Sequence, residues 1–175
     1  MSAATILAWH DFFMTMAQVG ATLAGLLFVG LTISLPHVLG VSGYLSRAFA
    51  ALFLQFEMLV IGLWGLLPAQ TGAALGWEFI VTGLAFATGI FLFAYNFPEA
   101  GQTVLGSRGP RTIRMLLSLG GTLFPVIAGI GLVAGRSDSL YLLMPATIGC
   151  LYLSIGNAWV FAVEIPRRKQ QNTEG

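Results

Sequence analysis

Five apolar segments, each long enough to cross a bilayer, constrain this chain more than any other feature. They cover residues 12–35, 48–67, 79–97, 115–134 and 139–163. The hydrocarbon core of a bilayer is about 30 Å thick, and a helix of about 20 residues spans it. In lipid, only helices and closed barrels satisfy every backbone polar group, and segments of this length are helical. The sequence therefore predicts an all-α polytopic membrane protein, a bundle of five transmembrane helices in a single membrane domain over residues 1–175.

The composition excludes the soluble classes of protein. The chain is 57% hydrophobic and 9% charged, whereas about 25% of the residues in a soluble domain are charged. Its net charge of +1 creates no general field that would attract a nucleic acid. The lipid bilayer is therefore the expected surrounding, and no nucleic-acid partner is expected.

The sequence offers no recognisable set of catalytic residues. We find no serine, histidine and acid set, no metal-ligand cluster and no phosphate-binding glycine loop. The single cysteine, Cys150, excludes an intrachain disulfide and a cysteine-based metal cluster. We therefore expect a protein that is not an enzyme and that has no cofactor or metal site.

Glu57 is the only ionisable residue in the middle of an apolar span. A central acidic residue costs about 2.5 to 3.5 kcal/mol on insertion scales, whereas the Leu, Ile, Phe and Val residues of this span return about 3 to 6 kcal/mol. The span therefore inserts together with its acid. No Lys or Arg lies at the same depth, so we expect a neutral acid that donates a hydrogen bond. Its expected acceptor is a hydroxyl of the first or fourth span, or the carbonyl of Gly121, which Pro125 leaves without a donor.

Gln55 points about 200° away from Glu57 around the same helix, so burial of both side chains requires neighbours on two faces. Either the second span is central in the bundle or one of its faces contacts another copy. We favour the oligomer, because a small bundle encloses few helices. Glu57 itself is open to three interpretations: a structural residue, a proton or cation site on a permeation path, or a contact with a partner. The candidate intramembrane polar site comprises Glu57, Gln18, Thr22, Gln55, Thr122 and Asn157.

A stripe of small and polar residues follows the first span. At about 100° per residue, one face carries Asp11, Thr15, Gln18, Ala21, Thr22, Gly25 and Thr32. Leu23, Leu26, Leu27 and Leu31 fall away from this face. In a membrane such a stripe faces protein and the leucines face lipid, and we expect this orientation here. Ala17, Ala21 and Gly25 also form a ladder of small residues, which we interpret as a packing surface rather than a dedicated dimer motif.

Similar stripes line the fourth and fifth spans. The fourth span aligns Ser118, Thr122, Pro125 and Gly129, and the fifth aligns Thr147, Cys150, Ser154 and Asn157. Such stripes are typical of a bundle in which close van der Waals contact replaces the hydrophobic effect.

The basic residues predict the orientation of the chain. Five spans place the two termini on opposite sides, and the loops on the amino-terminal side hold one basic residue, Arg136. The loops on the other side hold seven: Arg47, Arg108, Arg111, Arg114, Arg167, Arg168 and Lys169. The positive-inside rule then gives an external amino terminus and a cytoplasmic carboxyl terminus. All of the seven except Arg47 are expected to contact lipid headgroups, each worth about 1 kcal/mol.

Several short motifs resemble a group of small, mostly uncharacterised multi-span proteins of the bacterial inner membrane. They lie at 11–13, 19–21, 25–30, 67–70, 157–160 and 163–165. Some members of this group are labelled modulator of FtsH protease, an accessory to a membrane-bound ATP-dependent protease. The resemblance implies a location in the bacterial inner membrane and no catalytic residues.

Taken together, these features predict a non-enzymatic accessory or modulator subunit of a membrane complex, present as a homo-oligomer or in a larger assembly. The alternative is a small homo-oligomeric ion or proton channel that uses Glu57. A third possibility, a lipid-handling protein, depends on the basic cytoplasmic side alone. If the first holds, the loop at 98–114 and the basic tail are candidate contact surfaces.

Overall fold

The computed structural model describes residues 8–40, 42–96 and 110–159 of the chain. This part is helical apart from short connections such as 66–71 and 134–136, and it contains no strand, which confirms the predicted all-α bundle. Its elements are α2 (His10–Gly40), α3 (Ser42–Gly65), α4 (Gly72–Asn96), α5 (Pro110–Val133), the 3-10 helix η1 (Ser137–Leu142) and α6 (Leu143–Trp159).

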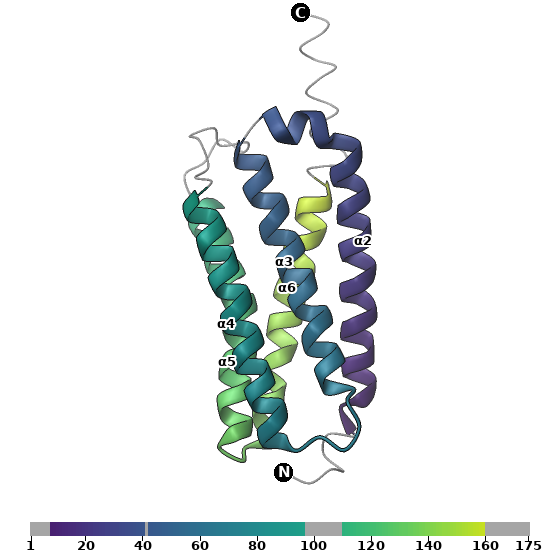
Figure 1. The fold of residues 1–175 in the computed structure, drawn as a ribbon, viewed down its shortest axis with the longest axis vertical. Coiled ribbons are helices and arrows are strands. Elements are labelled where there is room, and N and C mark those ends of the chain that lie inside the picture. Colours follow the sequence, from purple (N-terminus) through teal and green to yellow (C-terminus); the bar gives the residue numbers. More distant parts are fainter. Residues whose placement is uncertain (1–7, 41, 97–109, 160–175) are drawn as a thin grey trace, which may run out of the picture.

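The five α-helices lie side by side and alternate in direction along the chain (Figure 1). Within the described residues, four apolar stretches are long enough to cross a membrane: His10–Ile33, Ala48–Gly65, Gly72–Leu92 and Ser137–Gly156. The apolar part of α5, Gly120–Val133, is shorter, but α5 itself runs along α4 for most of that helix's length (Figure 1). Because α3 contacts α2, α4, α5 and α6, it is the central helix of the bundle.

Several helices begin or end beyond the expected boundaries. Residues 36–47 were expected to form a connection, yet α2 continues through Pro36 to Gly40 and α3 begins at Ser42. A proline removes one backbone hydrogen bond and bends a helix without necessarily ending it, and the last part of α2 turns across the end of the bundle (Figure 1). Likewise α4 begins at Gly72 rather than at residue 79, because the Thr71 hydroxyl caps it by accepting a bond from the Ala74 amide at 3.2 Å.

A close backbone contact joins α2 to α3 through glycine. A Cβ atom added to Gly62 would lie 2.7 Å from the backbone nitrogen of Ala17 and 2.8 Å from the carbonyl oxygen of Phe13. On the opposite helix, a Cβ added to Gly20 would lie 2.9 Å from the backbone nitrogen of Leu59. The two backbones touch here, and small residues are what permits such an approach in a membrane. This contact determines which face of α2 turns inward.

We predict that Gly62→Ala destabilises the bundle by about 1 to 3 kcal/mol, because the new methyl group overlaps backbone atoms that cannot move aside. The matched control is Gly30→Ala, where an added Cβ meets nothing within 4 Å and the change should be neutral or slightly stabilising. Unfolding in mixed detergent micelles measures both variants. Equal stability of the two would contradict the contact between α2 and α3.

Candidate intramembrane polar site

Gln55 and Glu57, in the middle of α3, are both enclosed within a single chain. The side chain of Gln55 is 0% exposed and that of Glu57 is 2% exposed. Both sides of α3 are buried because α3 is the central helix of the bundle. A central position was one of the two alternatives that the sequence left open. A contact with another copy is therefore not needed to bury either residue.

Gln55 links α3 to α6. Its Nε2 donates a hydrogen bond to the Ser154 hydroxyl and another, at 3.4 Å, to the carbonyl oxygen of Cys150. Among the described residues, its Oε1 atom has no partner. The sequence placed Ser154 on a stripe of α6 but did not predict this bond. A second missed bond joins α3 to α4, where Trp64 Nε1 donates to the Thr82 hydroxyl at 3.1 Å.

Glu57 has no hydrogen-bond partner in the described part of the chain, for either carboxyl oxygen. The expected bond to the region around Gly121 or to a hydroxyl of the first or fourth span is not formed. The expected region nevertheless packs against α3, because a Cβ atom added to Gly121 would lie 2.9 Å from the Cδ2 atom of Leu54. A Cβ added to Gly121 would lie 3.1 Å from the sulfur of Cys150. Because Pro125 lies within α5 and has no N–H, the Gly121 carbonyl lacks its usual helical donor.

Three of the six candidate residues, Gln55, Glu57 and Thr122, lie in the interior of the bundle. Thr122 is fully buried on α5, on the same side of that helix as the buried Pro125 and Gly129, so it joins Gln55 and Glu57 inside the bundle. Gln18 and Thr22 lie elsewhere, on the outer face of α2. The side chain of Asn157 lies outside the described residues.

Within a single chain, the expected packing of the polar stripe of α2 against the other helices is not found. All seven members of its polar stripe are exposed on the outside of the bundle: Asp11, Thr15, Gln18, Ala21, Thr22, Gly25 and Thr32. The buried face instead carries Phe13, Ala17, Gly20, Ala24 and Leu27. Both faces contain small residues, so this criterion alone could not distinguish them. The inner face was selected because Ala17 and Gly20 allow the backbone contact with α3.

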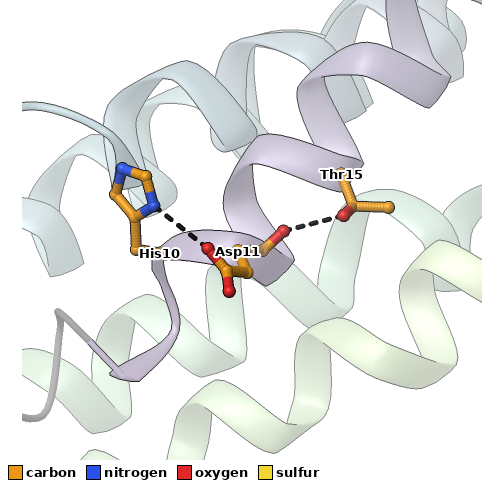
Figure 2. A network of polar contacts seen from close by, with 3 residues as sticks. All are labelled: His10, Asp11 and Thr15. Carbon is orange, nitrogen blue, oxygen red and sulfur yellow. Dashed lines mark hydrogen bonds and ion pairs between the residues drawn. The ribbon is translucent and has the colours of Figure 1, made fainter.

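The hydroxyl groups of the outer face are satisfied within α2 itself. Thr15, Thr22 and Thr32 each donate to the carbonyl oxygen four residues earlier, at 2.7 to 2.8 Å. Figure 2 shows the first of these bonds, from Thr15 to the carbonyl of Asp11, beside the contact between His10 and the Asp11 carboxylate. No described residue is hydrogen-bonded to the side chain of Gln18. Its amide is therefore the polar group of this face that is left for a partner.

Most of the expected headgroup contacts fall outside the described residues. Arg108, Arg167, Arg168 and Lys169 lie in residues that the structure does not describe, and of Arg111 and Arg114 only the backbone, at the start of α5, is described. These contacts remain predictions.

Comparison with models of protein families, with curated proteins and with solved structures gave no match. The resemblance to small inner-membrane proteins therefore remains a prediction from short motifs.

We predict that Glu57→Met stabilises the bundle by about 1 to 3 kcal/mol, because it replaces a buried polar group that has no partner with an apolar group of similar volume. The matched variant is Gln55→Met, which should cost about 1 kcal/mol because it removes the link to Ser154. Unfolding of both variants in detergent micelles tests this contrast. A large loss of stability in Glu57→Met would mean that the carboxyl group has a partner in the fold.

Proposed function

We propose that this membrane protein is a non-enzymatic accessory subunit, which acts by packing against other helices in the plane of the membrane. The observation that carries the proposal is the outward orientation of the polar stripe of α2. The stripe lies within the apolar span His10–Ile33, so most of it lies at the depth of the lipid tails.

Lipid tails offer no hydrogen-bond partner to the polar side chains of such a face. Helices in a membrane associate through close packing and interhelical hydrogen bonds, which are worth about 0.6 to 2 kcal/mol each. The amide of Gln18 can form such a bond only with another molecule, whereas the outer faces of the other helices are mainly apolar, with hydroxyl groups at positions such as Thr88 and Tyr152. Their exposed side chains include Val81, Phe91, Ile127, Ile130 and Ile148. Among these surfaces, the stripe of α2 is the one suited to another protein.

The finer parts of the proposal come from the sequence. The short inner-membrane motifs suggest a modulator of a larger complex, such as a membrane protease, in the bacterial inner membrane. The excess of basic residues suggests an external amino terminus and a cytoplasmic carboxyl terminus.

A second candidate function, ion or proton handling at Glu57, is favoured by one observation. Glu57 and Gln55 together present three buried oxygen atoms without a partner among the described residues, and such groups in membrane spans often mark ion paths. Because Glu57 is enclosed within one chain, a pore along an oligomer axis would not be lined by it. A path would have to run through the bundle itself.

We predict that a photoreactive amino acid at Thr22 forms adducts with protein when native membranes are irradiated. The same amino acid at Ile148, an exposed position of α6, should react mainly with lipid. Gel mobility and mass spectrometry of the adducts distinguish the two. If position 22 also gave only lipid adducts, the face would be free and the proposal would fail.

We predict that neither the native protein nor Glu57→Gln increases proton or cation flux in liposomes above the level of empty vesicles. The substitution keeps a hydrogen-bond donor and removes the ionisable group, so it isolates ionisation from packing. If the native protein increased flux and the variant did not, the result would contradict the accessory role and support ion conduction through Glu57.

A further inference from the structure

We infer that the bundle opens between α3 and α4 at the end where α3 begins, and that this opening admits water to Glu57 from one side of the membrane. The inference goes beyond the proposed accessory role and does not depend on the outer face of α2.

The two halves of α4 are packed differently. Its first half holds a buried residue in every turn: Gly72, Leu75, Gly76, Phe79, Thr82 and Gly83. After Gly83, none of the described residues of α4 is buried, and Phe86, Gly89 and Ile90 are half-buried. This second half lies beside the first half of α3, at the end of the bundle where α3 begins (Figure 1). A segment with few buried contacts opens locally at a lower free energy than the core of the same protein.

The contacts between α3 and α4 differ between the two ends as well. Toward the start of α4, Trp64 Nε1 donates a hydrogen bond to the Thr82 hydroxyl at 3.1 Å. Toward the other end, the rings of Phe53 and Phe86 meet edge to face, with their centroids 5.7 Å apart. Separation of two apolar rings leaves no polar group without a partner, whereas separation of Trp64 from Thr82 would. The end at Phe53 and Phe86 is therefore the end that opens.

The helices α4 and α5 move together in such an opening. A Cβ atom added to Gly83 would lie 2.9 Å from the carbonyl oxygen of Thr122, so the two backbones touch in the middle of the pair. In contrast, α3 meets α5 through a side chain, because a Cβ atom added to Gly121 would lie 2.9 Å from Leu54 Cδ2. Separation of α3 from the pair therefore uncovers Leu54.

Glu57 lies where the well-packed half of this boundary ends. At about 100° per residue, it lies within about 40° of both Phe53 and Trp64 around α3, and thus on the side of α3 that these two residues turn to α4. Neither of its carboxyl oxygens has a partner among the described residues. Water supplies hydrogen bonds to a carboxyl group in either protonation state. Hydration of Glu57 therefore offsets the apolar contacts that the opening breaks.

The path to Glu57 is short and ends there. Glu57 lies about 14 Å from Ala48, where the apolar span of α3 begins, at 1.5 Å per residue. On the other side of Glu57 the bond between Trp64 and Thr82 keeps the boundary closed. Water that reaches Glu57 from one side forms no continuous path, which agrees with the predicted absence of flux.

The reactivity of buried cysteines tests the inference. Cys150→Ser removes the single cysteine of the chain, and one new cysteine then replaces Leu54 or Ile61. Both side chains are 1% exposed, and they lie on opposite sides of Glu57 along α3. We expect a water-soluble maleimide to modify Leu54→Cys at least about ten times faster than Ile61→Cys in lipid nanodiscs, because a thiol reacts as the thiolate, which forms in water. Equal rates, or a faster reaction at Ile61→Cys, would overturn the inference.

Two variants test the role of Glu57 in the opening. Adding Glu57→Met to the Leu54→Cys chain should slow the modification about 5- to 150-fold, because a buried polar group without a partner is removed. Glu57→Gln should leave the rate nearly unchanged, because its amide also gains hydrogen bonds from water. An unchanged rate in Glu57→Met would show that hydration of Glu57 does not drive the opening.

Hydrogen exchange of the native protein in nanodiscs tests the same opening without a substitution, and it decides the matter if Leu54→Cys does not fold. The backbone amides of residues 84–92 should exchange at least about ten times faster than those of residues 75–83, because the second half of α4 opens locally. Equal protection of the two halves would overturn the inference.

Discussion

Hydrocarbon offers no hydrogen-bond partner to a polar side chain, and the arrangement of this bundle depends on that constraint. Gln55 and Glu57 point to different sides of one helix, so both escape lipid only if that helix is surrounded. The central position of α3 provides this, and the amide of Gln55 is anchored on Ser154 of α6. The glycine contact at Gly62 then brings α2 against α3 with its small, apolar face inward.

One consequence of that contact is a division of the polar residues into two groups with different roles. The inner group, around Gln55 and Glu57, belongs to a single chain. The outer group, along α2 from Thr15 to Thr32, is exposed where lipid would otherwise lie. Glu57 is the costliest member of the inner group, because a buried acid without a partner lowers stability without adding a contact. The outer group is the surface suited to another molecule.

The long apolar spans predicted the helical bundle correctly, and the depth of Glu57 predicted its burial. The inward stripes of α5 and α6 were also correct at Thr122, Cys150 and Ser154. The orientation of α2 was not predictable, because small residues line both of its faces. Only the fit of Ala17 and Gly20 against α3 decides between them, and such a fit involves two helices rather than one sequence pattern. The missing partner of Glu57 was unpredictable for the same reason, since its acceptors depend on neighbouring helices.

The number of chains per particle in lipid nanodiscs tests the central claim, that the outer face of α2 needs a protein partner, most directly. Native mass spectrometry of particles formed directly from native membranes should find at least one further polypeptide bound to the native protein, either a second copy or a different protein. A variant that combines Gln18→Leu with Gly25→Leu should give single chains that keep their helical content, because both positions are exposed. Single chains of the native protein, stable across a range of lipid-to-protein ratios and with no other protein bound, would contradict the account.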